Sequence, residues 1–144
     1  MDLAANTFDG TMSPELGVLT QLTHLTLFDN TLSSSIPTQI GLLASLEVLD
    51  LGSNVLTGRI PSQVGLLTEL AGLSFFDNML TGSIPTQFEN LDRLQLLYLD
   101  GNDLVGTVPI GVCSIGLEEF WSDCSEVQCI CCTTCCDDSF GCVE

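Results

Sequence analysis

Residues 46–69 read LEVLDLGSNVLTGRIPSQVGLLTE, and the same pattern recurs along most of the chain. The first half of this stretch follows L-x-x-L-x-L-x-x-N, and the second half follows L-x-G-x-I-P. The asparagine recurs every 24 residues, at Asn6, Asn30, Asn54, Asn78 and Asn102. A period of this length indicates a solenoid in which each repeat forms one coil.

Each half of the repeat has its own physical role. The alternating leucines predict a short strand with one buried face, and stacking at about 4.8 Å turns such strands into a parallel sheet. An asparagine amide can both donate and accept, so we expect buried asparagines to satisfy the backbone groups of a tight bend. Proline fixes φ, which favours a short helical turn on the convex side. A single coil buries too little apolar surface to fold alone, so neighbouring coils must supply the rest.

With these motifs, residues 1–123 resemble the plant-type leucine-rich repeat family. The resemblance implies a right-handed β/α solenoid with a parallel concave sheet and a convex side of short 3-10 helices and turns. It also implies that the concave face binds a ligand, as in receptors, adhesion proteins and enzyme inhibitors. The sequence departs from the motif at Ser34, where Gly is expected, at Pro14, which is one place late, and at QFEN, residues 87–90.

The charge of the chain restricts its partners. There are 19 acidic residues against two arginines, Arg59 and Arg93, and no lysine, which gives a formal net charge of -17. Binding to nucleic acid or to anionic membranes depends on Lys and Arg, so both are excluded as partners. No apolar run reaches the roughly 18 residues of a membrane span, so this segment should not insert into a bilayer. A cationic or neutral partner is expected.

All eight cysteines follow residue 112, and seven of them lie in residues 124–144, a Cys-rich segment that we expect to cap the repeats of residues 1–123. An even, clustered number of cysteines favours disulfides and an extracellular or cell-surface location. The tail is similar to the ending of some secreted repeat proteins of unicellular algae. Sequence leaves the pairing open, and the spacing of Cys132 and Cys135 also fits a zinc or redox site, although a second such pair and a nearby His are missing. The disulfide candidates are Cys113, Cys124, Cys129, Cys131, Cys132, Cys135, Cys136 and Cys142.

The beginning of the chain matches the end of a strand rather than a complete coil. Leu3 and Asn6 occupy the last positions of the first-half motif, and no signal-peptide pattern precedes them. We therefore expect a fragment of a larger repeat protein or receptor, with an incomplete first coil.

Side chains between the buried leucines point to the concave side and mix aromatic rings with acids. Phe28 and Phe76 share one column, and Tyr98 stands beside Trp121 in another; the last coil also offers Glu119. Rings of this kind anchor protein or peptide partners, and rings with carboxylates also suit glycans. The rings could instead only cover neighbouring strands. The predicted ligand-binding residues are His24, Thr26, Phe28, Asp29, Asp50, Ser74, Phe76, Asp77, Tyr98, Asp100, Trp121 and Asp123.

Catalysis and cofactor binding are not expected. His24 has no plausible nucleophile partner, and the acids lie on an open sheet where little would shift a pKa. Asp29 and Asp77 have no dense D-x-D-x-D loop around them, so we expect solvated surface rather than a calcium site, and no metal or other cofactor. The main functional hypothesis is a non-enzymatic recognition module. The alternative is a structural, adhesion or ice-contact protein that uses the convex polar column of Thr38, Ser62 and Thr86.

Overall fold

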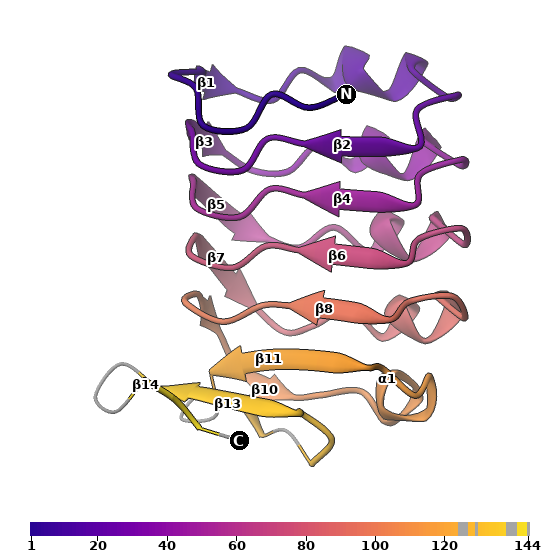
Figure 1. Cartoon of the computed structure of the whole chain (residues 1–144), viewed down its shortest axis with the longest axis vertical. Helices are drawn as coiled ribbons and strands as arrows, with labels where there is room; N and C mark the ends of the chain where they lie inside the picture. The colour runs from indigo at the N-terminus through magenta and orange to yellow at the C-terminus, as the bar shows by residue number, and fades with distance from the viewer. Residues whose placement is uncertain (124–126, 129, 138–140, 144) are drawn as a thin grey trace.

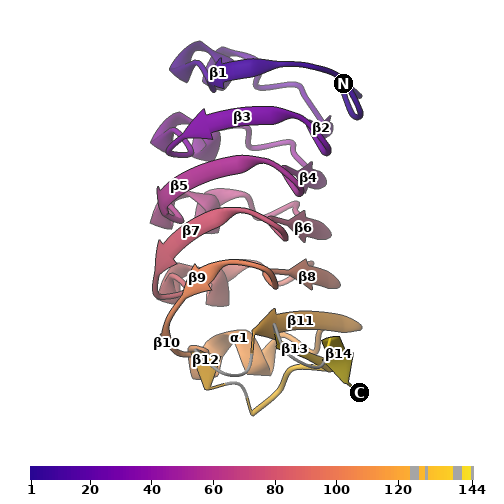
Figure 2. The ribbon, with the colours of Figure 1, turned by 90° about the vertical axis from the view of Figure 1, so that its left-hand side faces the viewer.

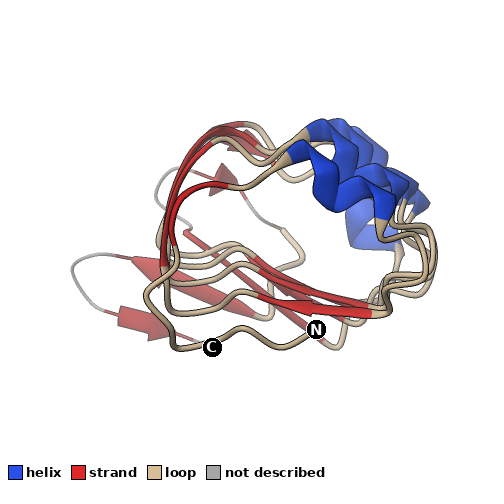
Figure 3. Ribbon diagram, turned by 90° about the horizontal axis from the view of Figure 1, so that it is seen from above, coloured by secondary structure: helices blue, strands red, loops and turns tan. Residues whose placement is uncertain are grey.

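The computed structural model describes residues 1–123, 127–128, 130–137 and 141–143, with side chains for those up to residue 134. The chain forms a stack of similar coils, and strands of successive coils lie side by side (Figure 1). Seen along the stack, each coil has an inner strand, a second strand and a short helix (Figure 3). The predicted solenoid is therefore confirmed.

The inner sheet runs along the stack from β2 onward, and the incomplete first coil adds only a parallel bridge of Asp2 to Thr26. Its strand order is β14-β13-β11-β8-β6-β4-β2, with all neighbours parallel except β13 and β14. The sheet continues across residue 123, the expected boundary between the repeats and the Cys-rich segment. The bounds are β2 His24–Thr26, β4 Val48–Asp50, β6 Gly72–Ser74, β8 Leu96–Tyr98, β11 Glu119–Asp123, β13 Thr134–Asp137 and β14 Gly141–Val143.

A second parallel sheet, which the sequence analysis missed, follows the asparagine turn of each coil (Figure 2). The prediction that the convex side consists only of helices and turns is therefore incomplete. The order of this sheet is β1-β3-β5-β7-β9, and a separate pair, β10 and β12, continues in the same direction along the chain. The bounds are β1 Asp9–Thr11, β3 Thr31–Ser34, β5 Val55–Arg59, β7 Met79–Gly82, β9 Asp103–Leu104, β10 Gly106–Thr107 and β12 Val127–Gln128.

The convex helices are mostly 3-10, as expected, and proline marks their beginnings. Pro37, Pro61 and Pro85 are the N-cap residues of three helices, with extended backbone that leads into the turn. Pro14 lies inside the first helix, and the Ser13 side chain caps that helix by accepting a hydrogen bond from the Glu15 amide. The bounds are η1 Pro14–Val18, η2 Thr38–Leu42, η3 Ser62–Leu66, η4 Thr86–Asn90 and α1 Ile110–Ser114.

The departure at Ser34 also leaves the coil geometry intact. Ser34 adopts a φ of 73°, close to the 78° of Gly58 and the 83° of Gly82 at the equivalent positions. A non-glycine residue adopts this conformation at some cost, so the surrounding strands impose it.

The core consists of the repeated leucines. Leu25, Leu49 and Leu97 are fully buried and Leu73 is 1% exposed, and the sheet register places them side by side. Phe120 occupies the same row in β11 and is also fully buried. The row confirms that each coil buries its leucines against its neighbours, which supplies the hydrophobic stabilisation that one coil lacks.

The buried asparagines form a ladder of hydrogen bonds, as predicted. The Nδ2 group of Asn78 donates to the carbonyl oxygens of Leu51, Phe75 and Phe76, at 3.0, 3.0 and 3.2 Å. Its Oδ1 atom accepts from the Leu56 amide at 3.0 Å. Asn54 makes the equivalent contacts one coil earlier. Each asparagine thus joins its own turn to the preceding coil.

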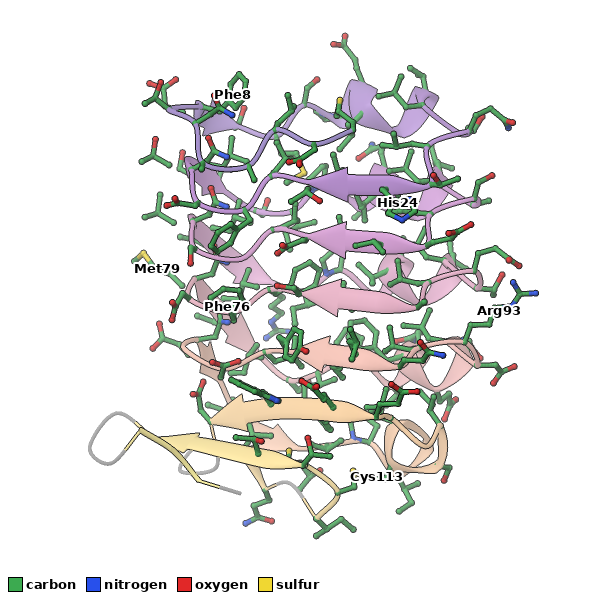
Figure 4. All side chains as sticks on the ribbon, in the orientation of Figure 1. Phe8, His24, Phe76, Met79, Arg93 and Cys113 are labelled. Carbon is green, nitrogen blue, oxygen red and sulfur yellow. A yellow bond between two sulfur atoms is a disulfide. The ribbon has the colours of Figure 1, made fainter. Side chains whose placement is uncertain are left out.

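A disulfide joins the last repeat to the Cys-rich segment. Cys113, at the lower right of Figure 4, is bonded to Cys131, with their Cα atoms 5.5 Å apart. Cys132 is also disulfide-bonded, so its sulfur is not a free thiolate for zinc. Cys124 and Cys129, and the side chains of Cys135, Cys136 and Cys142, lie outside what the structure describes. Among the described helices, none has the length and apolar character to cross a bilayer.

Candidate ligand-binding cleft on the inner sheet

The inner sheet carries its outward side chains in columns, because neighbouring strands pair in register. One column runs through Thr26, Asp50, Ser74, Tyr98 and Trp121. A second contains Phe28, Gly52, Phe76 and Asp100, at the ends of the same strands. The columns expected from the sequence are thus present, and Figure 4 shows Phe76 over this face.

Phe28 and Phe76 contact each other across the coil between them. Their ring centroids are 5.8 Å apart, although two coil spacings amount to about 9.6 Å. Gly52 makes this approach possible, since a Cβ atom there would lie 2.5 Å from the Phe76 ring. The glycine therefore allows two rings to meet over a strand that has no side chain of its own at this place.

Next to Phe76 the inner face is hollowed into an open cleft of about 450 Å³. Tyr98 and Trp121 form its aromatic floor and meet edge to face, with ring centroids 5.4 Å apart and an interplanar angle of 82°. The Tyr98 hydroxyl donates to Glu119 Oε2 at 2.7 Å, which fixes the positions of both side chains. The cleft is lined by Phe76, Asp77, Tyr98, Asp100, Glu119 and Trp121.

The cleft carries negative charge, and the pKa of one of its acids, Asp100, is raised. Burial raises the pKa of Asp100, and the nearby carboxylates of Asp123 and Asp77 raise it further, against a hydrogen bond from its own backbone amide. Its Oδ1 atom is buried and accepts no hydrogen bond from any described residue. Burial and the bond to Glu119 raise the pKa of Tyr98 to about 12, so the hydroxyl stays a neutral donor at physiological pH. The cleft thus combines apolar ring faces with uncompensated negative charge.

The remaining predicted residues differ in how much side chain they expose. His24 is exposed at the start of β2, far from Phe76 in Figure 4, and Thr26 is half-buried. Asp50 accepts a hydrogen bond from the Gly52 amide at 3.1 Å. Asp29 and Asp77 are exposed and have φ values of 55° and 50°, a conformation that Asp tolerates better than most residues. Local backbone geometry therefore accounts for the Asp of the repeated Asp-Asn pair.

Ser74 and Asp123 are buried, so the expectation that they offer their side chains to a partner is too broad. The Ser74 hydroxyl finds no hydrogen-bond partner in the described part of the chain. The Asp123 carboxylate accepts from the Gly101 amide at 2.9 Å and from the Asn102 amide at 3.1 Å. In the preceding coils the equivalent amides, of Asp77 and Asn78, donate to carbonyl oxygens of the next coil. Asp123 therefore ends the ladder of asparagine turns.

Glu119 is the cleft residue that sequence reasoning did not include among the binding residues. The sequence placed it on the inner face, but nothing in the repeat pattern indicated its bond to Tyr98. The signal that could have found it is its register: Glu119 pairs with Leu96, two residues before the pair of Trp121 and Tyr98 and on the same face of the sheet. A carboxylate at that place is within reach of the tyrosine hydroxyl on the adjacent strand.

The lining of the cleft determines which non-covalent interactions it offers. Its lining consists of rings and carboxylates, without a Ser, Cys or His nucleophile. No group of three or more metal-ligating side chains occurs among the described residues. Stacking, apolar contact and attraction of positive charge are the interactions that this lining offers.

Comparison with known proteins identifies similar folds. The family model described as Leucine Rich Repeat matches residues 45–67. The ectodomain of the plant membrane receptor kinase GASSHO1/SCHENGEN3 from Arabidopsis thaliana, solved with CASPARIAN STRIP INTEGRITY FACTOR 2, is 37% identical. That match covers 88% of this chain and 15% of the solved chain, with a TM-score of 0.80.

Two further solved structures are similar over most of this chain. The Arabidopsis receptor kinase HAESA ectodomain, in complex with an IDA peptide hormone ligand, is 35% identical; the match covers 85% of this chain and 21% of that one, with a TM-score of 0.79. A plant ice-binding protein is 30% identical; the match covers 84% of this chain and 39% of that one, with a TM-score of 0.74. The chain thus spans well under half of each of these three structures. No curated protein matches the chain in sequence.

Proposed function

Because this chain belongs to the plant-type leucine-rich repeat family, we propose that it is a non-enzymatic recognition module that binds a protein or peptide through the inner sheet. Solved relatives support this proposal, since the HAESA ectodomain holds a peptide hormone ligand. The observation that carries it is the aromatic cleft, where Phe76, Tyr98 and Trp121 surround a hollow of about 450 Å³. Partly exposed rings at the centre of a concave face are typical binding hot spots.

The test is selection of binding peptides from a random display library, followed by measurement of each selected peptide against variants. Phe76→Ala combined with Trp121→Ala should weaken binding by about a hundredfold, because each lost ring contact is worth more than about 1 kcal/mol. Phe8→Ala is the matched control, since Phe8 is 44% exposed and lies at the far end of the molecule (Figure 4). Peptides that bind the double variant as tightly as the parent chain would refute recognition through the inner face. A glycan partner would be revealed by the same variants on a sugar array.

We further propose an extracellular or cell-surface location, and a capping role for residues 124–144. The Cys113–Cys131 disulfide supports the first, because disulfides persist in oxidising compartments. Val127 and Phe120, each no more than 1% exposed, support the second, since the segment covers apolar surface at the end of the stack.

Ice contact is the second candidate function, and the similarity to a plant ice-binding protein favours it. Thr38, Ser62 and Thr86 are all exposed and begin η2, η3 and η4, so hydroxyl groups repeat along one side of the stack. An ice-growth assay decides between the two. Shaping of ice crystals that disappears in the triple alanine variant would support this role, and unshaped growth with the parent chain would remove it.

A further inference from the structure

The acids of the cleft have no cation of the chain beside them. The chain contains two arginines and no lysine. Arg59 lies on the second sheet, and Arg93 is paired with Glu69 at the edge of the molecule (Figure 4). Asp77, Asp100 and Glu119 therefore face the hollow without compensation, next to the faces of three rings.

Resting on the proposed function, we propose that this cleft binds the guanidinium group of an arginine side chain in the peptide partner. A guanidinium is flat, so it stacks on a ring while its edge donates hydrogen bonds to carboxylates. Trp121 and Phe76 supply ring surface, and Asp77 and the free Oε1 atom of Glu119 supply acceptors at the rim. The pairing of rings with acids in one hollow distinguishes this place from the rest of the inner face.

Contacts within the cleft hold its side chains in place before a guanidinium group enters. The Tyr98 hydroxyl holds Glu119, so little side-chain freedom is lost when the ligand enters. The edge-to-face contact of Tyr98 with Trp121 fixes the orientation of the indole. A cation in the hollow would also offset the buried negative charge of Asp100, whose pKa is raised because that charge is desolvated.

Other classes of ligand would make fewer favourable interactions with the rings and carboxylates of the cleft. An anionic group would be repelled by the three carboxylates and by the net charge of -17. A neutral sugar would use the rings but would leave the negative charge uncompensated. An ammonium group is more strongly hydrated than a guanidinium and lacks the flat shape that stacks on a ring. Arginine uses both the rings and the acids, which is why we choose it over lysine.

The experiment uses Trp121 as its reporter, since it is the only tryptophan of the chain. The probe is the short peptide acetyl-Gly-Arg-Gly amide, and its control is the same peptide with citrulline, which keeps the size and shape of arginine but not its charge. We expect the arginine peptide to change the Trp121 emission saturably. The citrulline peptide should bind at least about tenfold more weakly, because charge-assisted hydrogen bonds are about twice as strong as neutral ones.

Charge-removing variants complete the test. Asp77→Asn combined with Glu119→Gln keeps the shape of the cleft, and it should weaken arginine-peptide binding by at least about tenfold. Glu89→Gln, on the exposed face of η4, is the matched control and should leave binding unchanged. Added salt should weaken binding to the parent chain more than to the double variant. Equal affinity for the arginine and citrulline peptides, no saturable response to either, or an unchanged affinity of the double variant would each overturn the proposal.

Failure of this inference can be separated from failure of the proposed function. Library peptides that depend on Phe76 and Trp121 but lack arginine would overturn arginine recognition and leave peptide recognition standing. Conversely, a saturable arginine response without any selected peptide that depends on these rings would support the cleft chemistry and count against a peptide-recognition role for the inner face.

Discussion

The middle coils and the last coil satisfy the backbone amides of the turn after the inner strand in different ways. Around Asn54 and Asn78, the turn after the inner strand is satisfied by amides and carbonyls of adjacent coils. At the turn of Asn102, the carboxylate of Asp123 in the next coil accepts from two backbone amides, where backbone carbonyl oxygens accept in the earlier coils. Tyr98 and Trp121 lie in the column of the inner sheet that holds Asp50 in the coil of Asn54. The repeated residues therefore form the scaffold, and residues that depart from the repeat, such as Asp123 and Trp121, lie in the last coil.

The largest expected effect is on the interior of the asparagine ladder. Asn78→Ala removes three donated hydrogen bonds and one accepted bond in a buried place, so the free energy of unfolding should fall on the order of 4 kcal/mol. Asn6→Ala is the matched control, because Asn6 is exposed and donates to two nearby carbonyls; it should cost less than about 1 kcal/mol. Urea unfolding measures both. Equal losses would mean that burial within the stack does not distinguish the two turns.

The second expected effect is on the end of the ladder. Asp123→Asn replaces one acceptor oxygen by a donor, so either the Gly101 or the Asn102 amide loses its partner, at about 2 kcal/mol. Hydrogen exchange should show faster exchange at these two amides, with that of Asp77 and Asn78 little changed. Uniform acceleration over all the turns would contradict a role for Asp123 that is confined to the last coil.

The smallest expected effect concerns pH. Asp100 has a raised pKa because it is buried and faces Asp123 and Asp77, with Tyr98 and Glu119 also lining the hollow. The folded state then holds the proton more tightly than the unfolded state, so this group lowers stability as pH rises from 3.8 through its folded pKa. Asp100→Asn should therefore be more stable than the parent at neutral pH, with the difference vanishing in acid. Exposed Asp103→Asn is the control, and a gain of the same size there would exclude burial as the cause.

Sequence was sufficient for the parts of the fold that repeat. The leucine row from Leu25 to Leu97 and the asparagine ladder follow from period and alternation, because each position has the same neighbours in every coil. The second sheet was missed because strands such as Val55–Arg59 contain a glycine of positive φ and lack a sustained alternation of buried and exposed residues. The mixture of rings and acids on the inner face was predicted, but the hollow among them was not.

The sequence did not reveal features at positions whose neighbouring residues differ from one coil to the next. Asp123 looks like any inward-facing acid until the structure shows its carboxylate accepting hydrogen bonds from the Gly101 and Asn102 amides. Gly52 looks like an unremarkable turn residue, yet its missing side chain is what lets Phe76 reach Phe28. Glu119 follows a one-residue deletion in the repeat, so its partner on β8 becomes evident only from the register.

The contact between Phe28 and Phe76 also has a mechanical consequence. A bond between adjacent coils resists only local shear, but this pair of rings spans three successive inner strands. Any bending that opens the concave side there pulls the two rings apart, so it works against an aromatic contact of about 1 kcal/mol in addition to the strand pairing.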